Sequence, residues 1–217
     1  MSNEQINLYL TNLLPQQEDW VVQMENEGEK ERIPIMDPLS MNFLMQQIRL
    51  AKPKRILEIG TAIGYSALRM LEACPSASIV TIEKDVNRYE EALNNINQID
   101  EQEHIKVVHG DAKEVMQDFI SAGDRYDFIF IDAAKGQYKS YFHLADQLLS
   151  LDGMIACDNV LFKNYVIQPE RASKRHVKIA EKLRDFNEFL SNHPDYTTSI
   201  LPIGDGIAIS LKQTESK

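Results

Sequence analysis

The sequence contains few cysteines and no long apolar run, and both absences narrow the class of protein. Its 217 residues include two cysteines, Cys74 and Cys157, which are far apart and form no CxxC pair. A disulfide framework and a thiolate zinc site are therefore excluded. No apolar run approaches the roughly 20 residues of a membrane span, and the polar residues 1–5 lack the features of a signal or transit peptide. We expect a cytoplasmic protein that does not contact a membrane.

Positive charge is also scarce. The chain carries 23 lysines and arginines against 33 acidic residues, which gives a formal net charge of −10. A general nucleic-acid binder normally has a basic surplus, so the overall charge argues against that class. One segment departs from this balance, because residues 163–178 contain a single acid and five cations, which are Lys163, Arg171, Lys174, Arg175 and Lys178. They are either the solvated start of a helix or a local basic face.

Several catalytic signatures are missing. The chain has no GxSxG and no GK[ST] motif, which excludes an α/β-hydrolase and a P-loop enzyme. Its five histidines form no HExxH-type pair, so zinc hydrolysis is not expected. The turn that begins at Gly60 and ends at Gly64 has the spacing GxxxG rather than GxGxxG. It does not reproduce the pyrophosphate cradle of nicotinamide and flavin enzymes.

Hydrophobic periodicity predicts an α/β fold. Helical apolar stripes fill the first 50 residues, and Asp37-Pro38 has the residue types of a helix start. From residue 54, apolar runs alternate with further helical stripes, and the runs cover residues 55–60, 78–83, 105–111, 128–131 and 153–157. This alternation is typical of parallel strands joined by helices on both faces of a sheet.

The end of the chain has a different pattern. Apolar runs at 196–203 and 207–211 flank Gly204-Asp205-Gly206, which is a strong hairpin signal. We therefore predict a doubly wound α/β fold whose mostly parallel, seven-stranded sheet ends in an antiparallel hairpin. We expect a single domain over residues 1–217, with an N-terminal helical cap over 1–52 and a Rossmann-like unit over 53–217.

Acidic residues end successive predicted strands. Glu83 follows Gly60 by 23 residues, where an acid can accept hydrogen bonds from the ribose of a nucleoside cofactor. Asp111 and Asp132 end the next two strands, so all three carboxylates should face one crevice. Crowded carboxylates need a cation or hydrogen-bond donors nearby. The alternatives are a glycine turn needed only for folding and solvated loop acids.

The fourth and fifth strands end in a set of hard ligands. Asp132 ends the fourth strand, and Asp158 and Asn159 end the fifth. Two carboxylates and an amide oxygen suit Mg²⁺ and leave coordination positions for water and substrate. The alternative is a structural cluster of carboxylates that cap helices.

These residues together resemble the cation-dependent O-methyltransferases, the family that includes the catechol and caffeoyl-CoA O-methyltransferases. The resemblance covers about residues 30–212 and rests on Glu58-Ile59-Gly60-Thr61, Glu83, Gly110-Asp111-Ala112, Asp132-Ala133-Ala134-Lys135 and Cys157-Asp158-Asn159. Four more segments are similar to the bacterial tRNA 5-hydroxyuridine methyltransferases, namely Ile33-Pro34-Ile35-Met36, Ile63-Gly64-Tyr65-Ser66, Lys135-Gly136-Gln137-Tyr138 and Asn159-Val160-Leu161-Phe162-Lys163. The insertions of the plant caffeoyl-CoA enzymes are missing, which argues against an acyl-CoA substrate.

The resemblance implies a class I methyltransferase fold, S-adenosylmethionine as methyl donor, Mg²⁺ as cofactor and often a homodimer. It implies that the metal ligands are Asp132, Asp158 and Asn159. It also implies that the cofactor is bound by Met36, Gly60, Ser66, Glu83, Asp111, Ala112 and Asp132. The catalytic residues would be Lys135 and Asp132. Whether Lys135 acts as a general base or as an electrostatic stabiliser is left open by its acidic surroundings.

The resemblance leads us to expect methylation of the 5-hydroxyl of a wobble-position 5-hydroxyuridine in tRNA. The basic residues between 163 and 178 would then contact phosphates of the anticodon region. Phe162 either stacks on a base or packs in the core, which is the more common place for a phenylalanine. One alternative is O-methylation of small catechol-like phenols, which the negative net charge favours. Another is a non-catalytic module that binds S-adenosylmethionine and acts in RNA processing.

Overall fold

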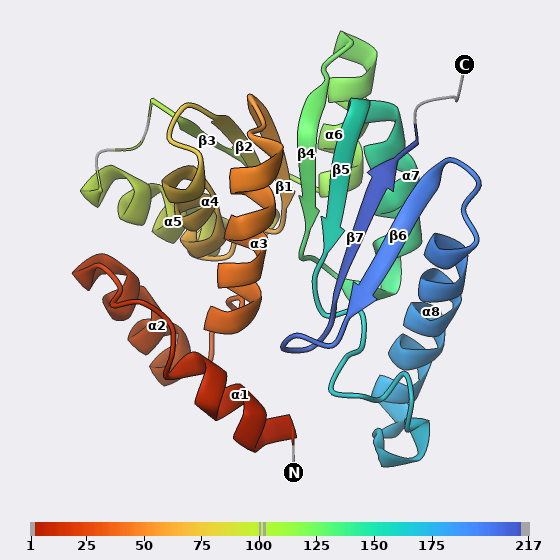
Figure 1. Ribbon diagram of the computed structural model, residues 1–217. Coiled ribbons are helices and arrows are strands. Elements are labelled where there is room, and N and C mark those ends of the chain that lie inside the picture. Colours follow the sequence, from red (N-terminus) through yellow and green to blue (C-terminus); the bar gives the residue numbers. More distant parts are fainter. Residues whose placement is uncertain (1–2, 100, 102, 214–217) are drawn as a thin grey trace.

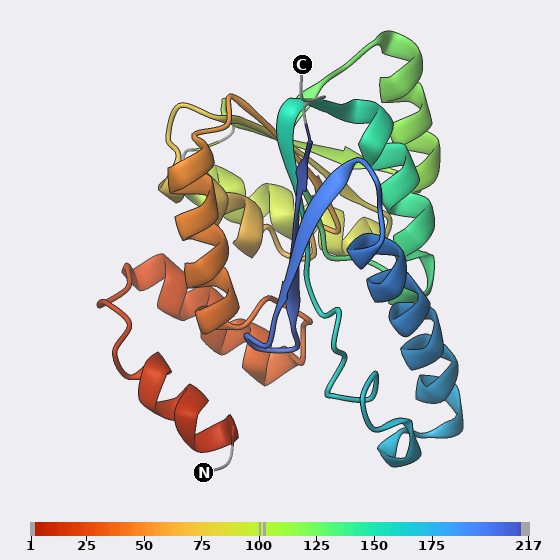
Figure 2. The ribbon, with the colours of Figure 1, turned by 45° about the vertical axis from the view of Figure 1, so that its right-hand side comes forward.

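The computed structural model describes residues 3–99, 101 and 103–213. Its centre is a seven-stranded sheet in the order β3-β2-β1-β4-β5-β7-β6, with helices on both faces (Figures 1 and 2). The parallel strands are β1 (Arg55–Ile59), β2 (Ser78–Glu83), β3 (Ile105–His109), β4 (Tyr126–Ile131) and β5 (Leu149–Cys157). The antiparallel strands at one edge are β6 (Tyr196–Leu201) and β7 (Ile207–Lys212). The predicted fold class is confirmed.

Helices precede and separate the strands as the periodicity predicted. The α-helices are α1 (Asn3–Thr11), α2 (Asp19–Glu31), α3 (Pro38–Ala51), α4 (Tyr65–Ala73), α5 (Val86–Gln98), α6 (Ala112–Ala122), α7 (Tyr138–Leu148) and α8 (Lys174–Ser191). The 3₁₀ turns are η1 (Lys135–Gln137) and η2 (Pro169–Arg171). Arg171 therefore lies before α8 and not in its first turn, because the chain leaves helical geometry at Ala172 and Ser173.

Local sequence explains where these elements begin. Asp37 caps α3, because its side chain accepts hydrogen bonds from the backbone N–H groups of Leu39 and Ser40 at 3.1 Å. Asp111 caps α6 in the same way, through the N–H of Lys113 at 3.0 Å. The third strand consequently ends at His109, two residues before the end that the sequence predicted. The division at residue 52 into a helical cap and a Rossmann-like unit stays a prediction.

The sheet is buried on both faces by two apolar clusters. Alternate strand residues such as Ile56 and Phe130 pack with α3 and α4 in one cluster. Their neighbours Leu57 and Ile131 pack with α6, α7 and α8 in the other. Burial on both sides accounts for the continuous apolar run of β4. No described helix is long and apolar enough to cross a membrane.

The order of the strands places a crevice between β1 and β4. The chain runs from β1 toward β2 and β3 on one side of β1, and β4 and β5 lie on the other side. Ligands in open α/β sheets bind at the carboxyl ends of the strands where the order reverses. The loops that follow β1 and β4 meet at this point.

Candidate cofactor and metal site

A cavity of about 310 Å³ lies at the carboxyl ends of β1 to β4. Eight of the residues that the sequence singled out line it, which are Met36, Gly60, Ser66, Glu83, Asp111, Ala112, Asp132 and Lys135. The cavity is within the range of small-molecule sites, although near its lower end. We call it the cofactor cavity. Residues from five separate segments of the chain therefore meet where the sequence predicted a binding site.

Gly60 is required by the fold itself. Its φ angle is +100°, and a Cβ atom added there would lie 2.0 Å from the backbone carbonyl oxygen of Asp132. A glycine is thus needed to let the loop after β1 approach the loop after β4, whether or not a ligand is bound. The folding explanation that the sequence left open applies at this position, and the residue lines the cavity as well.

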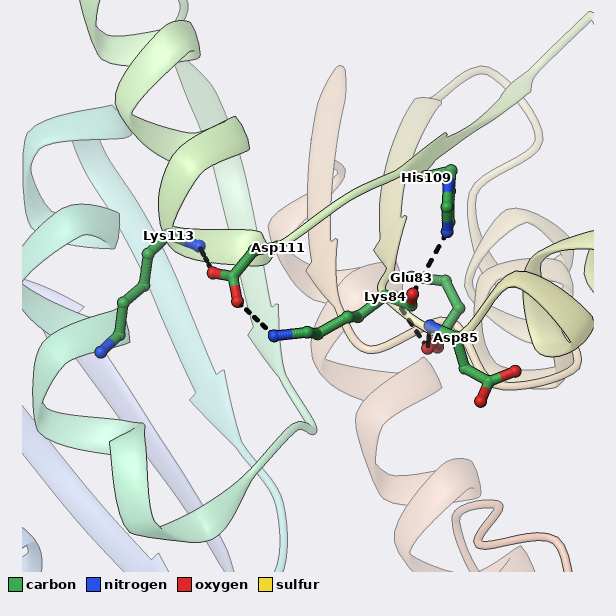
Figure 3. A network of polar contacts seen from close by, with 6 residues as sticks. All are labelled: Glu83, Lys84, Asp85, His109, Asp111 and Lys113. Atoms are coloured by element: carbon green, nitrogen blue, oxygen red, sulfur yellow. Dashed lines mark hydrogen bonds and ion pairs between the residues drawn. The ribbon is translucent and has the colours of Figure 1, made fainter.

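Glu83 is held rigidly at the end of β2. Its Oε2 accepts a hydrogen bond from the N–H of Ala62, and its Oε1 accepts from the N–H groups of Lys84 and Asp85, all at 2.9 Å. These donors fix the carboxylate, which lines the cavity. Figure 3 shows it beside Lys84 and Asp85. A carboxylate oxygen can accept more than one hydrogen bond, so ribose hydroxyls can still be bound.

Asp111 is paired with a lysine that the sequence did not single out. Its Oδ2 lies 2.7 Å from Nζ of Lys84, and its Oδ1 accepts the N–H of Lys113 (Figure 3). The ion pair with Lys84, together with that N–H, lowers the pKa of the Asp111 carboxyl below its usual value. The sequence did contain a sign of this pair, because Lys84 directly follows Glu83, the acid that ends β2. The Lys84 side chain is 76% exposed and lines the cavity.

Ser66 is joined to a buried carboxyl. Its hydroxyl donates to Oε1 of Glu58 at 2.5 Å, and the hydroxyl of Thr81 donates to Oε2 at 2.6 Å. Complete burial raises the pKa of Glu58 to about 8, against the opposing effect of these two hydrogen bonds. Ser66 therefore links the lining of the cavity to this buried carboxyl.

Asp132 and Asp158 lie side by side beyond the ends of β4 and β5. The last residues of these strands, Ile131 and Cys157, are register partners, and the N–H of Asp158 donates to the carbonyl of Ile131 at 3.1 Å. Burial raises the pKa of both carboxyls, and the charge of Asp132 raises that of Asp158 further. Lys135 opposes the rise at Asp132.

Asp158 has a buried carboxylate oxygen without a hydrogen-bond partner among the described residues. It is 2% exposed, and its Oδ1 has no hydrogen-bond partner among the described residues. Its Oδ2 accepts from Nδ2 of Asn159 at 2.5 Å, an arrangement that keeps the amide oxygen of Asn159 for another partner. A divalent cation would satisfy these oxygens, so the residues fit the predicted metal.

A second hollow adjoins the cofactor cavity and shares Ile35 and Met36 with it. Its volume is about 430 Å³, and its polar lining consists of Asn7, Thr11, Asp37, Asp158, Asn159, Gly204 and Asp205. We call it the side hollow. Asp132 thus belongs to the cofactor cavity and the other two predicted metal ligands to the side hollow. The proposed metal residues lie where the two spaces meet.

Asp205 holds the loop after Asn159 through hydrogen bonds. From the sequence, this residue was predicted only to be part of the hairpin turn. The N–H groups of Leu161 and Phe162 donate to the carbonyl of Asp205 at 2.8 and 3.1 Å, and that of Lys163 donates to its Oδ1 at 3.3 Å. Phe162, Lys163 and Asn164 are all left-handed, with φ of 45°, 54° and 62°. For Phe162 and Lys163 this conformation costs about 1–2 kcal/mol each, so the contacts with Asp205 must hold the loop.

The same turn reaches the N-terminal helices. A Cβ added to Gly204 would lie 2.0 Å from Oδ2 of Asp37 and 2.3 Å from Oγ of Ser40. Figure 1 shows the β6–β7 turn between the start of α3 and the loop after β5. One turn therefore contacts both walls of the side hollow.

The predicted basic residues lie next to this loop. Lys163 is in the loop, Arg171 is in η2, and the other three, Lys174, Arg175 and Lys178, are on α8. All five are exposed. Phe162 is only 9% exposed, and Lys135 Nζ lies 5.9 Å from the centre of its ring.

A seven-stranded sheet in this order, with a cavity at its carboxyl edge, is the fold of the Rossmann-like methyltransferases. Comparison with known families narrows the class. The chain belongs to the O-methyltransferase family, whose profile matches residues 16–213.

Individual relatives agree with this assignment. Caffeoyl-CoA O-methyltransferase 2 of Populus trichocarpa is 34% identical over 176 residues, which are 77% of this chain and 70% of the relative. A Staphylococcus aureus crystal structure, provisionally named a caffeoyl-CoA O-methyltransferase, is 33% identical with a TM-score of 0.89 and covers 96% of this chain and 100% of its own. The S-adenosylhomocysteine-bound methyltransferase PaMTH1 of Podospora anserina is 27% identical, with a TM-score of 0.84 and coverages of 97% and 95%.

Proposed function

We propose that this protein transfers a methyl group from S-adenosylmethionine to the 5-hydroxyl of 5-hydroxyuridine at the wobble position of tRNA, with Mg²⁺ as cofactor. The observation that carries the proposal is the pair of half-buried Asp132 and buried Asp158 beside the cofactor cavity, with one carboxylate oxygen of Asp158 that has no partner among the described residues. Family membership supports the O-methyl chemistry.

The cofactor cavity supplies groups for each part of the methyl donor. Glu83 would accept hydrogen bonds from the ribose, Asp111 and Ala112 would flank the adenine, and Gly60, Ser66 and Met36 would surround the methionine end. When bound, S-adenosylmethionine supplies a methyl carbon activated by its sulfonium. The role of these residues is to hold that carbon in line with an oxygen nucleophile.

Asp132, Asp158 and the amide oxygen of Asn159 would hold the divalent ion. When bound, such an ion lowers the pKa of a coordinated hydroxyl and orients it. An acceptor with two adjacent oxygens suits this arrangement, and 5-hydroxyuridine offers its 5-hydroxyl and 4-carbonyl oxygens. Lys135 takes the hydroxyl proton or stabilises the developing anion. The new C–O bond replaces the C–S bond, and S-adenosylhomocysteine and a proton are released.

A second candidate is O-methylation of small catechol-like phenols. The identity to plant caffeoyl-CoA enzymes and the net charge of −10 favour it. Catechol also presents two adjacent oxygens, so the same metal residues would serve both acceptors.

The two candidates separate in one assay. The purified protein is supplied with Mg²⁺, labelled S-adenosylmethionine and either hydroxyuridine-containing tRNA or catechol. We expect label in 5-methoxyuridine after nuclease digestion and mass spectrometry. Label in catechol alone overturns the tRNA substrate, and label in neither supports a non-catalytic binding module.

The catalytic role proposed for Lys135 can be tested by comparing its substitution with that of Lys139. Lys135→Met should lower turnover about 10²–10⁴-fold, the usual contribution of a proton-transfer group. Lys139→Met is the matched control, because Lys139 Nζ lies over the ring of Phe189 at 4.7 Å and outside the cofactor cavity. Equal turnover of the two variants would remove Lys135 from the mechanism.

A further inference from the structure

Three aromatic rings form a cluster at the outer side of the loop that follows the metal residues. The ring centres of Phe162, Tyr165 and His176 lie 5.4–5.8 Å apart. Tyr165 and His176 are stacked, with 20° between their planes, and Phe162 stands at 85° to both. Phe162 is buried, whereas Tyr165 and His176 are half-buried, so part of the stacked pair reaches solvent.

The cluster is continuous with the reacting end of the cofactor cavity. Lys135 lines that cavity, and its Nζ lies 5.9 Å from the ring centre of Phe162. The path therefore leads from the proposed catalytic lysine to Phe162 and then to the stacked pair. A ligand bound in the cavity and extending outward on this side would meet aromatic surface first.

Cations are concentrated in the segment that carries the stacked pair. Residues 163–178 hold five cations against one acid in a chain whose net charge is −10. None of the five forms an ion pair within the part of the chain that the structure describes. Three of them, Lys174, Arg175 and Lys178, lie in the first turns of α8, where cations oppose the helix dipole. A local arrangement that works against helix stability is typical of a functional surface.

The backbone presents this surface in one fixed shape. Phe162 and Lys163 are left-handed and donate to Asp205, and the left-handed Asn164 accepts from the N–H groups of Ile167 and Gln168. On the other side, Arg184 donates from Nε and Nη2 to the carbonyl of Val166 at 3.1 and 2.6 Å. Tyr165 therefore sits between two anchored points. Strained backbone that is fixed in this way is found at binding sites.

We propose that Tyr165 and His176, with the surrounding cations, form a platform for single-stranded RNA next to the acceptor nucleoside. A base adjacent to the acceptor stacks on the pair, and its phosphates contact Lys163, Arg171 and Lys174. Aromatic stacking beside basic groups is how proteins bind unpaired bases. The inference rests on the proposed function, because that function brings a single-stranded loop to this side of the cavity.

The test measures RNA affinity separately from methylation. A fluorescent, unmodified anticodon stem-loop RNA is titrated with the full chain at several salt concentrations. Tyr165→Ala/His176→Ala should weaken binding about tenfold or more, as expected for the loss of base stacking, with little change in the salt dependence. Tyr165→Phe should retain wild-type affinity, because it keeps the ring. Tyr9→Ala, at a 63% exposed tyrosine on α1, is the control and should bind like wild type.

The cations are tested by the slope of the binding constant against salt. Each phosphate contact to a single strand contributes about 0.7 to that slope, so Lys163→Gln/Lys174→Gln should lower it by about 1.4. Wild-type affinity of the double alanine variant, with circular dichroism showing a native fold, overturns the platform. Equal binding of polyglutamate and RNA by wild type overturns it as well, because the surface would then be a general anion site.

Failure of the platform and failure of the proposed function give different results. If wild type binds RNA through the stacked pair but methylates only catechol, the platform stands and the tRNA substrate fails. If wild type methylates tRNA and the double alanine variant keeps the wild-type KM, the function stands and the platform fails.

Discussion

The two halves of the site differ in how completely their charged groups are satisfied. At the ends of β2 and β3, Glu83 accepts three backbone N–H groups, and Asp111 pairs with Lys84 and caps α6 through the N–H of Lys113. At the ends of β4 and β5, Asp132 is half-buried and Asp158 is buried, both with raised pKa values, and one oxygen of Asp158 has no partner among the described residues. The acids of the first half have their partners without a ligand, whereas the second half needs a cation, a proton or a further hydrogen-bond donor.

The largest effect should come from the unsatisfied half. Asp158→Asn should lower turnover about 10³-fold, because a bound metal contributes several kcal/mol to transition-state stabilisation. The same change should raise the Tm of chelator-treated protein, since it removes a buried acid without a full set of partners. Steady-state kinetics and calorimetry in EDTA measure the two effects.

Asp127→Asn is the matched control for Asp158→Asn. Asp127 lies near the opposite end of β4, where it accepts hydrogen bonds from the N–H groups of Lys54 and Arg55. It should retain turnover and lose stability. If both variants lose turnover equally, the loss at Asp158 cannot be assigned to a bound metal.

Gly60→Ala tests whether the loop after β1 must approach the loop after β4, which belongs to the second half. It should lower the free energy of unfolding by about 3 kcal/mol, since it combines a positive φ with a clash against backbone. Gly123→Ala is the comparison, because Gly123 has φ of +78° but nothing within 4 Å of the added Cβ. It should cost about 1 kcal/mol. Equal losses in urea denaturation would contradict the steric argument.

Glu58 allows a further comparison with Asp158, because both acids are buried but both carboxyl oxygens of Glu58 have hydrogen-bond partners. Its pKa is raised in the folded protein to about 8 from 4.5, so the folded state binds more protons between these pH values. The free energy of unfolding should therefore fall as pH rises through that window, by about 1.4 kcal/mol for each pH unit, and level off above it. Denaturation at pH 5–9 should show this slope in wild type and in Glu90→Gln, at an exposed acid, and a smaller slope in Glu58→Gln.

The smallest effect should come from the satisfied half. Lys84→Gln removes an ion pair whose lysine is 76% exposed, and solvent screens such pairs so strongly that they contribute little to stability. The Tm should stay close to that of wild type, and any difference should vanish at high salt. A loss of stability as large as that of Gly123→Ala would show that this half also depends on a single contact.

The sequence predicted the elements whose causes are local. The helix start at Asp37-Pro38, the strand runs and the Asp-Gly hairpin depend on neighbouring residues, and each is found in the structure. The gathering of predicted cofactor residues around one cavity followed from the rule that ligands bind at the carboxyl ends of parallel strands.

Other features depend on pairs of segments that are distant in the chain. The steric need at Gly60 comes from a carbonyl 72 residues away, at Asp132. The role of Asp205 depends on a loop more than 40 residues before it, and three left-handed residues without glycine have no sequence signal. No periodicity or motif reports such contacts, so they were found only in the structure.

The turn between β6 and β7 has a consequence for how this scaffold diversifies. Because Gly204 abuts the start of α3 while Asp205 anchors the loop after β5, one surface turn touches both walls of the side hollow. If the acceptor enters through this hollow, as the proposed metal residues there would require, insertions or exchanges in the turn would change which acceptors fit. The residues that line the cofactor cavity would stay as they are, so selectivity could change without rebuilding that cavity.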